Sequence, residues 1–343
     1  MPTHPTFGLW FDFRYPEDAT SREAAYRSTL EQIVRAEAAG FDSVWLTEHH
    51  FQNDGYTPSP LIIAAAIGAA TTTLRIGTNL ALLPLYHPVR LAEEAATLSL
   101  LTGGRFDLGV GAGYVEREYS AFGRQLKHRP SLMEEALTVI RQAWTGAPLS
   151  HRGKRHQFEG IQVSPVPETL PRLLVGAVAP PAIARAARLA DGFLDSGGAG
   201  QAAYVQAVTD AGRKASDAAI FQGCWDIVCN DPDQGLAALG DALLRQMRGY
   251  QAMGAFPDAT LDKPEQAVMQ GFYRFLTPGQ MVESIMQQLE RYPQTRDIHF
   301  WGRFPGESNT SAEARMALLA AEVLPRVRER VARQQIDKER KTV

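Results

Sequence analysis

The sequence has few cysteines and little net charge. Its 343 residues include only Cys224 and Cys229, which are too few for a disulfide framework, so we predict that both are reduced core residues. The formal net charge is -3 at pH 7, which gives no reason to expect a nucleic acid or an anionic membrane as partner. These two observations favour a reducing, cytoplasmic setting.

Long apolar runs and a secretion signal are absent as well. The most apolar run, residues 61–70, is too short to cross a bilayer. The opening "MPTHPTFG" lacks the basic region and the long apolar region of a signal peptide. We therefore expect a soluble, cytoplasmic protein without a membrane partner.

What the sequence does contain is a regular alternation of short apolar runs with longer segments of helical period. Such alternation predicts a parallel sheet with crossover helices, and eight units favour a (β/α)8 TIM barrel, an α/β fold, over an open sheet. We expect insertions after strand 4 and strand 7, a single domain over 1–333, and a frayed tail over 334–343. The strand candidates are 7–13, 43–50, 74–84, 105–114, 172–178, 192–198, 224–230 and 297–306.

Polar residues come late in several of these strands, where a barrel places its catalytic groups. The densest cluster is Glu48-His49-His50, after the second strand. Side chains alternate along a strand, so His49 is expected to point opposite to Glu48 and His50, which argues against one metal held by all three. The cluster could bond backbone groups in a structural role, or its histidines could move protons near neutral pH.

Three other features allow two interpretations each. The glycine-rich run 109–114 could bring N–H groups close to a phosphate or a flat ring, or could simply form a tight turn at the barrel rim. The amide of Asn79 could bond a ligand ring or a neighbouring strand. The helix that carries "PLIIAAAIGAAT" is apolar on most sides, which predicts a subunit interface or burial under an inserted loop.

Five stretches in order carry a family resemblance: "GFDSVWLTEHHF" (40–51), "LRIGT" (74–78), "HPVRLAEE" (87–94), "GGRFDLGVG" (103–111) and "EREYSAFG" (116–123). They resemble the bacterial luciferase-like family of flavin-dependent monooxygenases. The resemblance implies a TIM barrel that binds reduced FMN, or the deazaflavin F420 in one branch, at its C-terminal mouth. The histidine pair resembles the FMN enzymes more than the F420 branch.

The resemblance also implies roles for particular residues. His49 would lie beside the flavin and handle the proton of a flavin C4a-peroxide formed with O2, and His50 would act behind it or on the substrate side. Asn79 and Leu80 occupy the place of a bulge with a non-prolyl cis peptide under the flavin ring. The full set of expected cofactor-binding residues is Glu48, Asn79, Leu80, Gly111, Ala112, Gly113, Tyr114, Ala177 and Val178.

The phosphate end departs from the family pattern, because many relatives have an arginine where this sequence has Ala112. Arg129 or Lys127 could reach in instead. We therefore expect weak, exchangeable FMN binding and a separate flavin reductase as partner.

For the substrate, we expect a small, largely apolar molecule under a lid formed by 249–275, and we expect a homodimer. An F420-dependent dehydrogenase and a non-catalytic flavin-binding protein are the alternatives. The aromatic residues expected to line the substrate pocket are Phe11, Phe13, Tyr114, Phe256, Phe272 and Tyr273.

Overall fold

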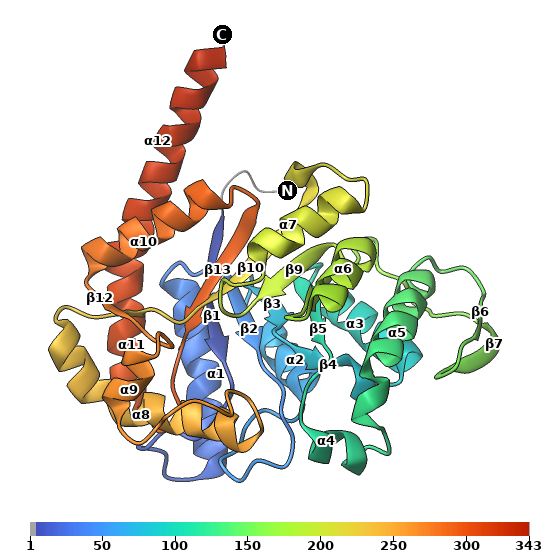
Figure 1. The fold of residues 1–343 in the computed structure, drawn as a ribbon, viewed down its shortest axis with the longest axis horizontal. Helices are drawn as coiled ribbons and strands as arrows, with labels where there is room; N and C mark the ends of the chain where they lie inside the picture. Colours follow the sequence, from blue (N-terminus) through green and yellow to red (C-terminus); the bar gives the residue numbers. More distant parts are fainter. Residues whose placement is uncertain (1–4, 343) are drawn as a thin grey trace.

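Eight parallel strands close into a barrel in the computed structural model, which describes residues 5–342 (Figure 1). Around the barrel the order is β1-β2-β3-β5-β8-β9-β10-β13, and β13 pairs back with β1. The predicted TIM barrel is therefore confirmed. The strands are β1 (Thr6–Phe11), β2 (Ser43–Leu46), β3 (Arg75–Thr78), β5 (Phe106–Gly111), β8 (Arg172–Gly176), β9 (Gly192–Asp195), β10 (Ile220–Cys224) and β13 (Thr295–Trp301).

Helices cover the outside of the barrel, and local sequence signals set their ends. The Ser21 hydroxyl caps the first helix by accepting a hydrogen bond of 3.1 Å from the Ala24 N–H. Gly40 follows the same helix with φ of 90°, a conformation that glycine adopts without steric cost. The covering helices are α1 (Arg22–Ala38), α2 (Pro60–Ala70), α3 (Pro88–Leu101), α5 (Arg129–Ala143), α6 (Pro180–Leu189), α7 (Gln201–Asp210), α10 (Pro278–Arg291) and α11 (Asn309–Leu318).

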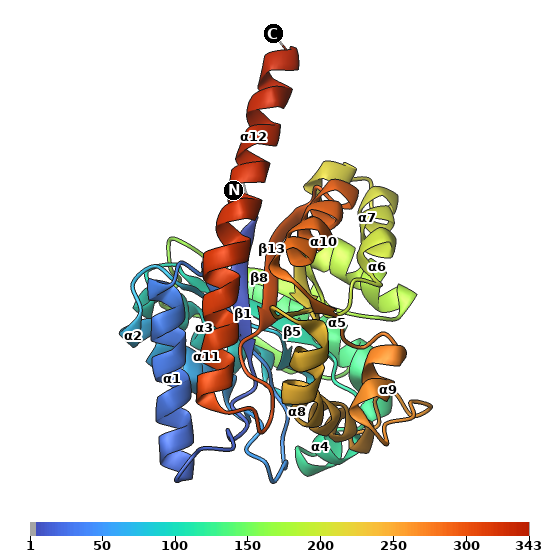
Figure 2. The ribbon, with the colours of Figure 1, turned by 90° about the vertical axis from the view of Figure 1, so that its left-hand side faces the viewer.

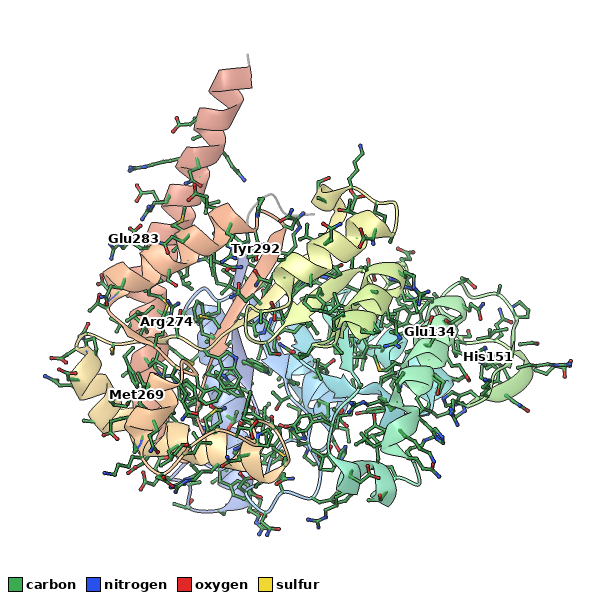
Figure 3. The ribbon with its side chains drawn as sticks, in the orientation of Figure 1. Glu134, His151, Met269, Arg274, Glu283 and Tyr292 are labelled. Carbon is green, nitrogen blue, oxygen red and sulfur yellow. The ribbon has the colours of Figure 1, made fainter. Side chains whose placement is uncertain are left out.

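Insertions after the fourth and seventh barrel strands build the mouth. In Figure 1, α4 and α8 lie at the lower end of the barrel, where the strands end. Figure 3 places Met269 and His151 on opposite sides of the molecule, so the inserted segments flank the barrel. The added elements are α4 (Glu116–Ala121), the antiparallel hairpin β6 (Leu149–Arg152) and β7 (Gln157–Ile161), α8 (Pro232–Ala252), α9 (Pro264–Met269), and the short pair β11 (Ile227–Val228) and β12 (Phe275–Leu276).

The C-terminal helix leaves the barrel on the side away from the mouth. A π-helical turn, η4 (Leu319–Val323), joins α11 to α12 (Leu324–Thr342), whose end projects from the body (Figure 2). The backbone is helical through most of 334–343, the segment for which we predict fraying; residues 1–4 and 343 lie outside the described part. No helix among residues 5–342 is long and apolar enough to cross a bilayer.

The seventh strand lies earlier in the sequence than the apolar pattern predicts. The prediction of 224–230 was wrong, because the barrel strand β10 ends at Cys224 and Ile227–Val228 pairs with β12 outside the barrel. The apolar pattern of β10 is interrupted by the polar Gln222 and the small Gly223, so the sequence did not indicate a strand there. A Cβ at Gly223 would lie 2.7 Å from the Trp10 ring, so the indole needs a glycine there. Both cysteines are free thiols and half-buried.

A buried ion cluster fills the end of the barrel opposite the mouth. The Asp107 carboxylate accepts hydrogen bonds from Arg75 Nη2 at 2.7 Å and from Arg172 Nε at 2.8 Å. Burial alone would raise the pKa of Asp107, but Arg172 and Arg75 hold it below its ordinary value of 3.8. Strands β3, β5 and β8 are tied together through this one carboxylate.

We expect Asp107→Asn to lower the free energy of unfolding by about 3 kcal/mol at neutral pH, because two guanidinium groups lose their counter-charge. A carboxyl with a depressed pKa stabilises the folded state above its unfolded pKa, so the difference should shrink as pH falls below 3.8. Urea unfolding measures both effects. Glu329→Gln, which breaks the exposed pair of Arg333 and Glu329, is the control and should cost under about 0.5 kcal/mol. Equal losses in the two variants would contradict the assignment.

Candidate active site

His49 lies just beyond the end of β2 and faces a cluster of tyrosines at the barrel mouth. Its ring centroid lies 4.9 Å from that of Tyr56, 5.5 Å from that of Tyr114 and 6.5 Å from that of Tyr250. The imidazole is only 6% exposed. Burial raises the pKa of each of these three tyrosines, so the phenols are neutral around His49 at neutral pH.

Glu118 of α4 orients the His49 ring. Its Oε1 atom lies 2.9 Å from His49 Nδ1 and also accepts a hydrogen bond of 2.8 Å from the His50 N–H. A carboxylate only accepts hydrogen bonds, so Nδ1 carries the proton and the lone pair of Nε2 is directed toward Tyr114, whose hydroxyl is 3.5 Å away. Nε2 is therefore able to accept a proton at the mouth. The sequence reasoning did not single out Glu118, although it lies in the family-like stretch "EREYSAFG".

His50 and Glu48 point away from His49, as strand alternation predicts. His50 Nε2 lies 2.9 Å from Glu48 Oε1, and the ring packs against Phe122. Glu48 also accepts hydrogen bonds from the Leu82 N–H at 2.7 Å and from the Tyr86 hydroxyl at 2.9 Å. The carboxylate of Glu48 thus joins the end of β2 to the segment after β3, and the structure brings neither residue to the mouth beside His49.

The Arg14 guanidinium packs against two rings of the tyrosine cluster. Its guanidinium carbon lies 4.3 Å from the Tyr56 ring centroid and 5.5 Å from that of Tyr250, which comes from α8. Burial opposes the charge on Arg14, but Asp12 at 3.2 Å outweighs that effect and raises the pKa of the guanidinium. Asp54 lies 3.6 Å away on the other side. The cation is therefore compensated by two carboxylates.

Tryptophans form the apolar part of the mouth. Trp10 stacks on Trp301 with 4.6 Å between centroids, and Trp225 packs edge-on against Trp10 at 6.1 Å. Tyr273, from the segment 249–275, lies 5.6 Å from Trp225. That segment therefore reaches the mouth, and its role as a lid stays a prediction.

Two of the predicted pocket residues lie elsewhere. Phe11 and Phe13 belong to the main hydrophobic core, so their assignment to the substrate pocket was wrong. A Cβ at Gly302 would lie 2.3 Å from the Phe11 ring, which shows how closely β13 packs against that ring. The alternation along β1 turns Trp10 into the barrel and its neighbour outward.

Asn79 and Leu80 lie at the mouth end of β3, and the peptide bond between them is cis, as the family resemblance implies. Leu80 packs between two strand ends, because a Cβ at Gly111 or at Gly176 would lie within 2.5 Å of its side chain. Asn79 Nδ2 lies 2.8 Å from His299 Nε2, a partner across the barrel interior. Asn79 Oδ1 and Trp301 Nε1 are buried without a hydrogen-bond partner among the described residues. An unpaired acceptor and an unpaired donor suit a flat, polar-edged ligand.

The expected phosphate end offers few groups to an anion. Pro180 and Pro181 lack N–H groups, and the N–H groups of Ala182 and Ile183 already bond the Ala179 carbonyl. Val178 is 93% exposed at this rim, and Ala177 is half-buried against the core.

On the neighbouring loop, Gly113 has a φ of 69° and the Tyr119 hydroxyl donates to the Ala112 carbonyl. Tyr119 lies within the electrostatic range of Arg129, whose positive charge opposes the rise in the pKa of that phenol caused by burial. Arg129 is thus a cation whose charge acts on this turn. Among the side chains that the structure describes, no group of three or more His, Cys, Asp or Glu residues could hold a metal ion.

Comparisons with known proteins place this geometry in context. A family model described as luciferase-like monooxygenase matches residues 6–297. The F420-dependent glucose-6-phosphate dehydrogenase of Amycolatopsis mediterranei is 31% identical over 209 residues, which are 59% of this chain and 62% of that relative. The chain spans 48–62% of the length of the first curated relatives it matches.

Two solved structures share the whole fold. The monooxygenase RslO1 from Streptomyces bottropensis has a TM-score of 0.81 at 22% identity, with 94% of this chain and 99% of that one covered. The oxygenating constituent of the Pseudomonas putida 3,6-diketocamphane monooxygenase, a type II Baeyer–Villiger enzyme in complex with FMN, has a TM-score of 0.74 at 22% identity, with the same coverage. At this identity the likeness shows the fold.

We expect Glu118→Ala to release the His49 ring from its fixed tautomer. With the carboxylate present, two-bond 15N–1H correlation spectra should show His49 protonated at Nδ1; without it, the Nε2–H form that predominates in free histidine should appear. Glu116→Ala, an exposed change on the same helix, is the matched control. An unchanged His49 spectrum in Glu118→Ala would show that another group sets the tautomer.

Proposed function

We propose a function for this chain from one premise: it belongs to the luciferase-like monooxygenase family. The chain is thus an oxidoreductase, and we propose that it uses reduced FMN and O2 to oxygenate a small, largely apolar organic substrate. The observation that carries the proposal is the His49–Glu118 pair, whose geometry leaves His49 Nε2 facing an aromatic mouth.

The mouth fits a flavin ring in its chemistry. Leu80 supplies an apolar surface between the glycines that end β5 and β8, and Asn79 Oδ1 and Trp301 Nε1 supply an unused acceptor and donor. These residues and Tyr114 would hold the ring. When bound, reduced flavin supplies the electrons that activate O2, and the protein supplies orientation, proton transfer and exclusion of water.

His49 is the catalytic residue in this proposal. Its Nε2 would take or return the proton that moves during oxygen transfer, while Glu118 keeps the ring in one orientation and stabilises the positive charge that forms. His50 has a different role, because its ring is bonded to Glu48 and lines a groove beside α2. We assign His50 to the support of the β2 end.

An F420-dependent dehydrogenase is the second candidate, since several curated relatives are F420-dependent glucose-6-phosphate dehydrogenases. A sugar phosphate requires an uncompensated cation, and Arg14 is already paired with Asp12 and Asp54. The mouth therefore favours an apolar substrate. Titration of the protein with reduced FMN and with F420, followed by fluorescence, separates the two cofactors.

The rim expected to bind the FMN phosphate offers few hydrogen-bond donors or cations, which favours a cofactor that exchanges. The prolines at the start of α6 and the exposed Val178 offer the phosphate few groups, and we assign its binding to Arg129 rather than to Lys127 because the charge of Arg129 acts on the neighbouring Tyr119. We propose that FMN binds reversibly and arrives reduced from a separate flavin reductase.

A homodimer is the proposed assembly. Ile62 of α2 is 74% exposed and Leu101 of α3 is 67% exposed, and both line a groove of about 650 Å³ with Phe122. Contiguous apolar side chains of this kind mark an interaction surface, and here none of the described loops covers them.

We expect His49→Ala to lower the yield of oxygenated product per reduced FMN consumed by about 10- to 100-fold, because the proton-transfer group is lost. Hydrogen peroxide release should rise in compensation. Product analysis over a panel of aliphatic aldehydes and cyclic ketones measures the yield. His87→Ala, a change at an exposed histidine outside the proposed site, is the control. A wild-type yield from His49→Ala would remove His49 from the mechanism.

We expect Arg129→Ala to raise the dissociation constant of FMN about fivefold and to leave that of riboflavin unchanged, because riboflavin has no phosphate. Lys127→Ala, two residues away, should affect neither ligand. Fluorescence titration with both flavins measures the effect. If only Lys127→Ala weakens FMN selectively, the assignment to Arg129 is wrong.

We expect Ile62→Glu to raise the dimer dissociation constant about 100-fold, because two like charges would be buried at a symmetric contact. Sedimentation equilibrium measures the constant. Phe256→Glu, at an exposed aromatic residue on the α8–α9 segment, is the control. A wild-type protein that sediments as a monomer would contradict the proposal outright.

A further inference from the structure

We propose that Asp297 and His299 are positioning residues that turn the Asn79 carboxamide so that its oxygen selects reduced over oxidised flavin. The inference rests on the proposed function, since it concerns the flavin of that site. It assigns a purpose to three buried polar side chains in the barrel interior that proton transfer at His49 leaves unused.

The three side chains form one chain of hydrogen bonds. His299 Nδ1 lies 2.9 Å from Asp297 Oδ1, and His299 Nε2 lies 2.8 Å from Asn79 Nδ2. The imidazole is fully buried, with Trp45 stacked on it at 5.0 Å and Trp10 edge-on at 5.4 Å. Asp297 is saturated by donors from β1 and β2: Thr6 Oγ1 at 2.6 Å, Ser43 Oγ at 2.7 Å and Trp45 Nε1 at 2.9 Å.

The direction of each hydrogen bond in this chain fixes the orientation of the Asn79 carboxamide. The Asp297 carboxylate accepts only, so His299 Nδ1 carries the proton and Nε2 of the neutral ring accepts. Only the NH2 group of Asn79 can donate to it, which turns Oδ1 away from His299. If His299 were an imidazolium, Nε2 would donate, the amide would flip, and the NH2 group would face the ligand instead. The protonation state of His299 therefore decides whether the site presents an acceptor or a donor.

The relay runs along the barrel toward the mouth. In the strand register Thr6 pairs with Asp297, Gly8 with His299 and Trp10 with Trp301, so each step along β13 approaches the strand ends. Asn79 follows the last residue of β3, at that same edge. Trp10 Nε1 donates to the Asn79 backbone carbonyl at 3.1 Å, which anchors the residue at a second point. Asn79 Oδ1 itself is buried and has no partner among the described residues.

A fixed acceptor discriminates between the two redox states of a flavin. The reduced ring carries an N–H at N5, whereas oxidised N5 has a lone pair that a carbonyl oxygen repels. The relay fixes the orientation of the Asn79 amide before the flavin binds, so its oxygen accepts from reduced N5 but repels oxidised N5. An amide that rotated freely would turn its NH2 group toward oxidised N5 and would not discriminate between the two states. The relay thus makes the site prefer the reduced cofactor and release the oxidised one.

Anaerobic titration with reduced and oxidised FMN tests the proposal. The ratio of the two dissociation constants should favour reduced FMN in the wild type and should fall about tenfold in Asn79→Ala and in His299→Phe, which keeps the ring packed between the tryptophans. A tenfold fall equals a drop of about 30 mV in the potential of the bound two-electron couple. Thr78→Val, a buried polar-to-apolar change beside Asn79, is the control and should change neither constant selectively.

A purely structural role would weaken both redox states equally and leave the ratio unchanged, which would overturn the proposal. The preference should also be lost in the wild type with 5-deaza-FMN, which has carbon at position 5; a retained preference would overturn the assignment to N5.

The tautomer is measured on the protein without flavin, by 15N–1H spectra assigned with His299→Phe. An Nδ1–H neutral ring supports the relay, and an imidazolium overturns it. Absence of any flavin binding by the wild type would instead overturn the proposed function, so the two failures are distinguishable.

Discussion

The saturation of the buried Asp297 carboxylate by hydrogen-bond donors is the constraint on which the interior of this barrel depends, because a buried charge without partners is costly. Asp297 takes four donors from three strands inside the barrel. Once that carboxylate is saturated, the tautomer of His299 follows, and with it the orientation of Asn79. The relay is thus ordered from the Asp297 charge near one end to the unpaired Asn79 Oδ1 at the other. This unpaired oxygen is informative because the relay side chains beneath it, Asp297 and His299, are paired.

The same constraint separates the two adjacent histidines. Each imidazole has its own carboxylate: Glu118 from the inserted helix for His49, and Glu48, two residues earlier in the chain, for His50. The backbone alternation directs one ring to the mouth and the other to the surface beside α2, and the carboxylates keep them there. Two adjacent histidines therefore have different surroundings, and under the proposed function His49 transfers protons while His50 supports the end of β2.

Much of this arrangement could be predicted from the sequence where the signal was local. The alternation of strands and helices gave the barrel, and the period of two along a strand gave the opposite directions of His49 and His50. The seventh strand was misplaced because Gln222 and Gly223 interrupt its apolar pattern. The Trp10 ring leaves no room for a side chain at Gly223. Glu118, Arg14 and His299 were missed because their partners are 69, 42 and 220 residues away, and no local pattern reveals such pairings. Phe11 was assigned to the pocket because the sequence does not show which of the adjacent aromatic residues, Trp10 or Phe11, faces the inside of the barrel.

The balance of charge at the mouth narrows the chemistry further. Arg14 is flanked by two carboxylates, Glu118 accepts from the neutral His49 ring, and burial keeps the surrounding phenols neutral, so the described groups around His49 offer an anion no cation that lacks a carboxylate partner. An anionic substrate would have to be desolvated there without a compensating partner, which costs several kcal/mol, on the order of the penalty for one buried ion. An apolar substrate meets no such penalty and displaces water from tryptophan faces. Exclusion of water would also protect a reactive oxygen species from decay, so under the proposed function the feature that favours an apolar substrate is the one that oxygen transfer requires.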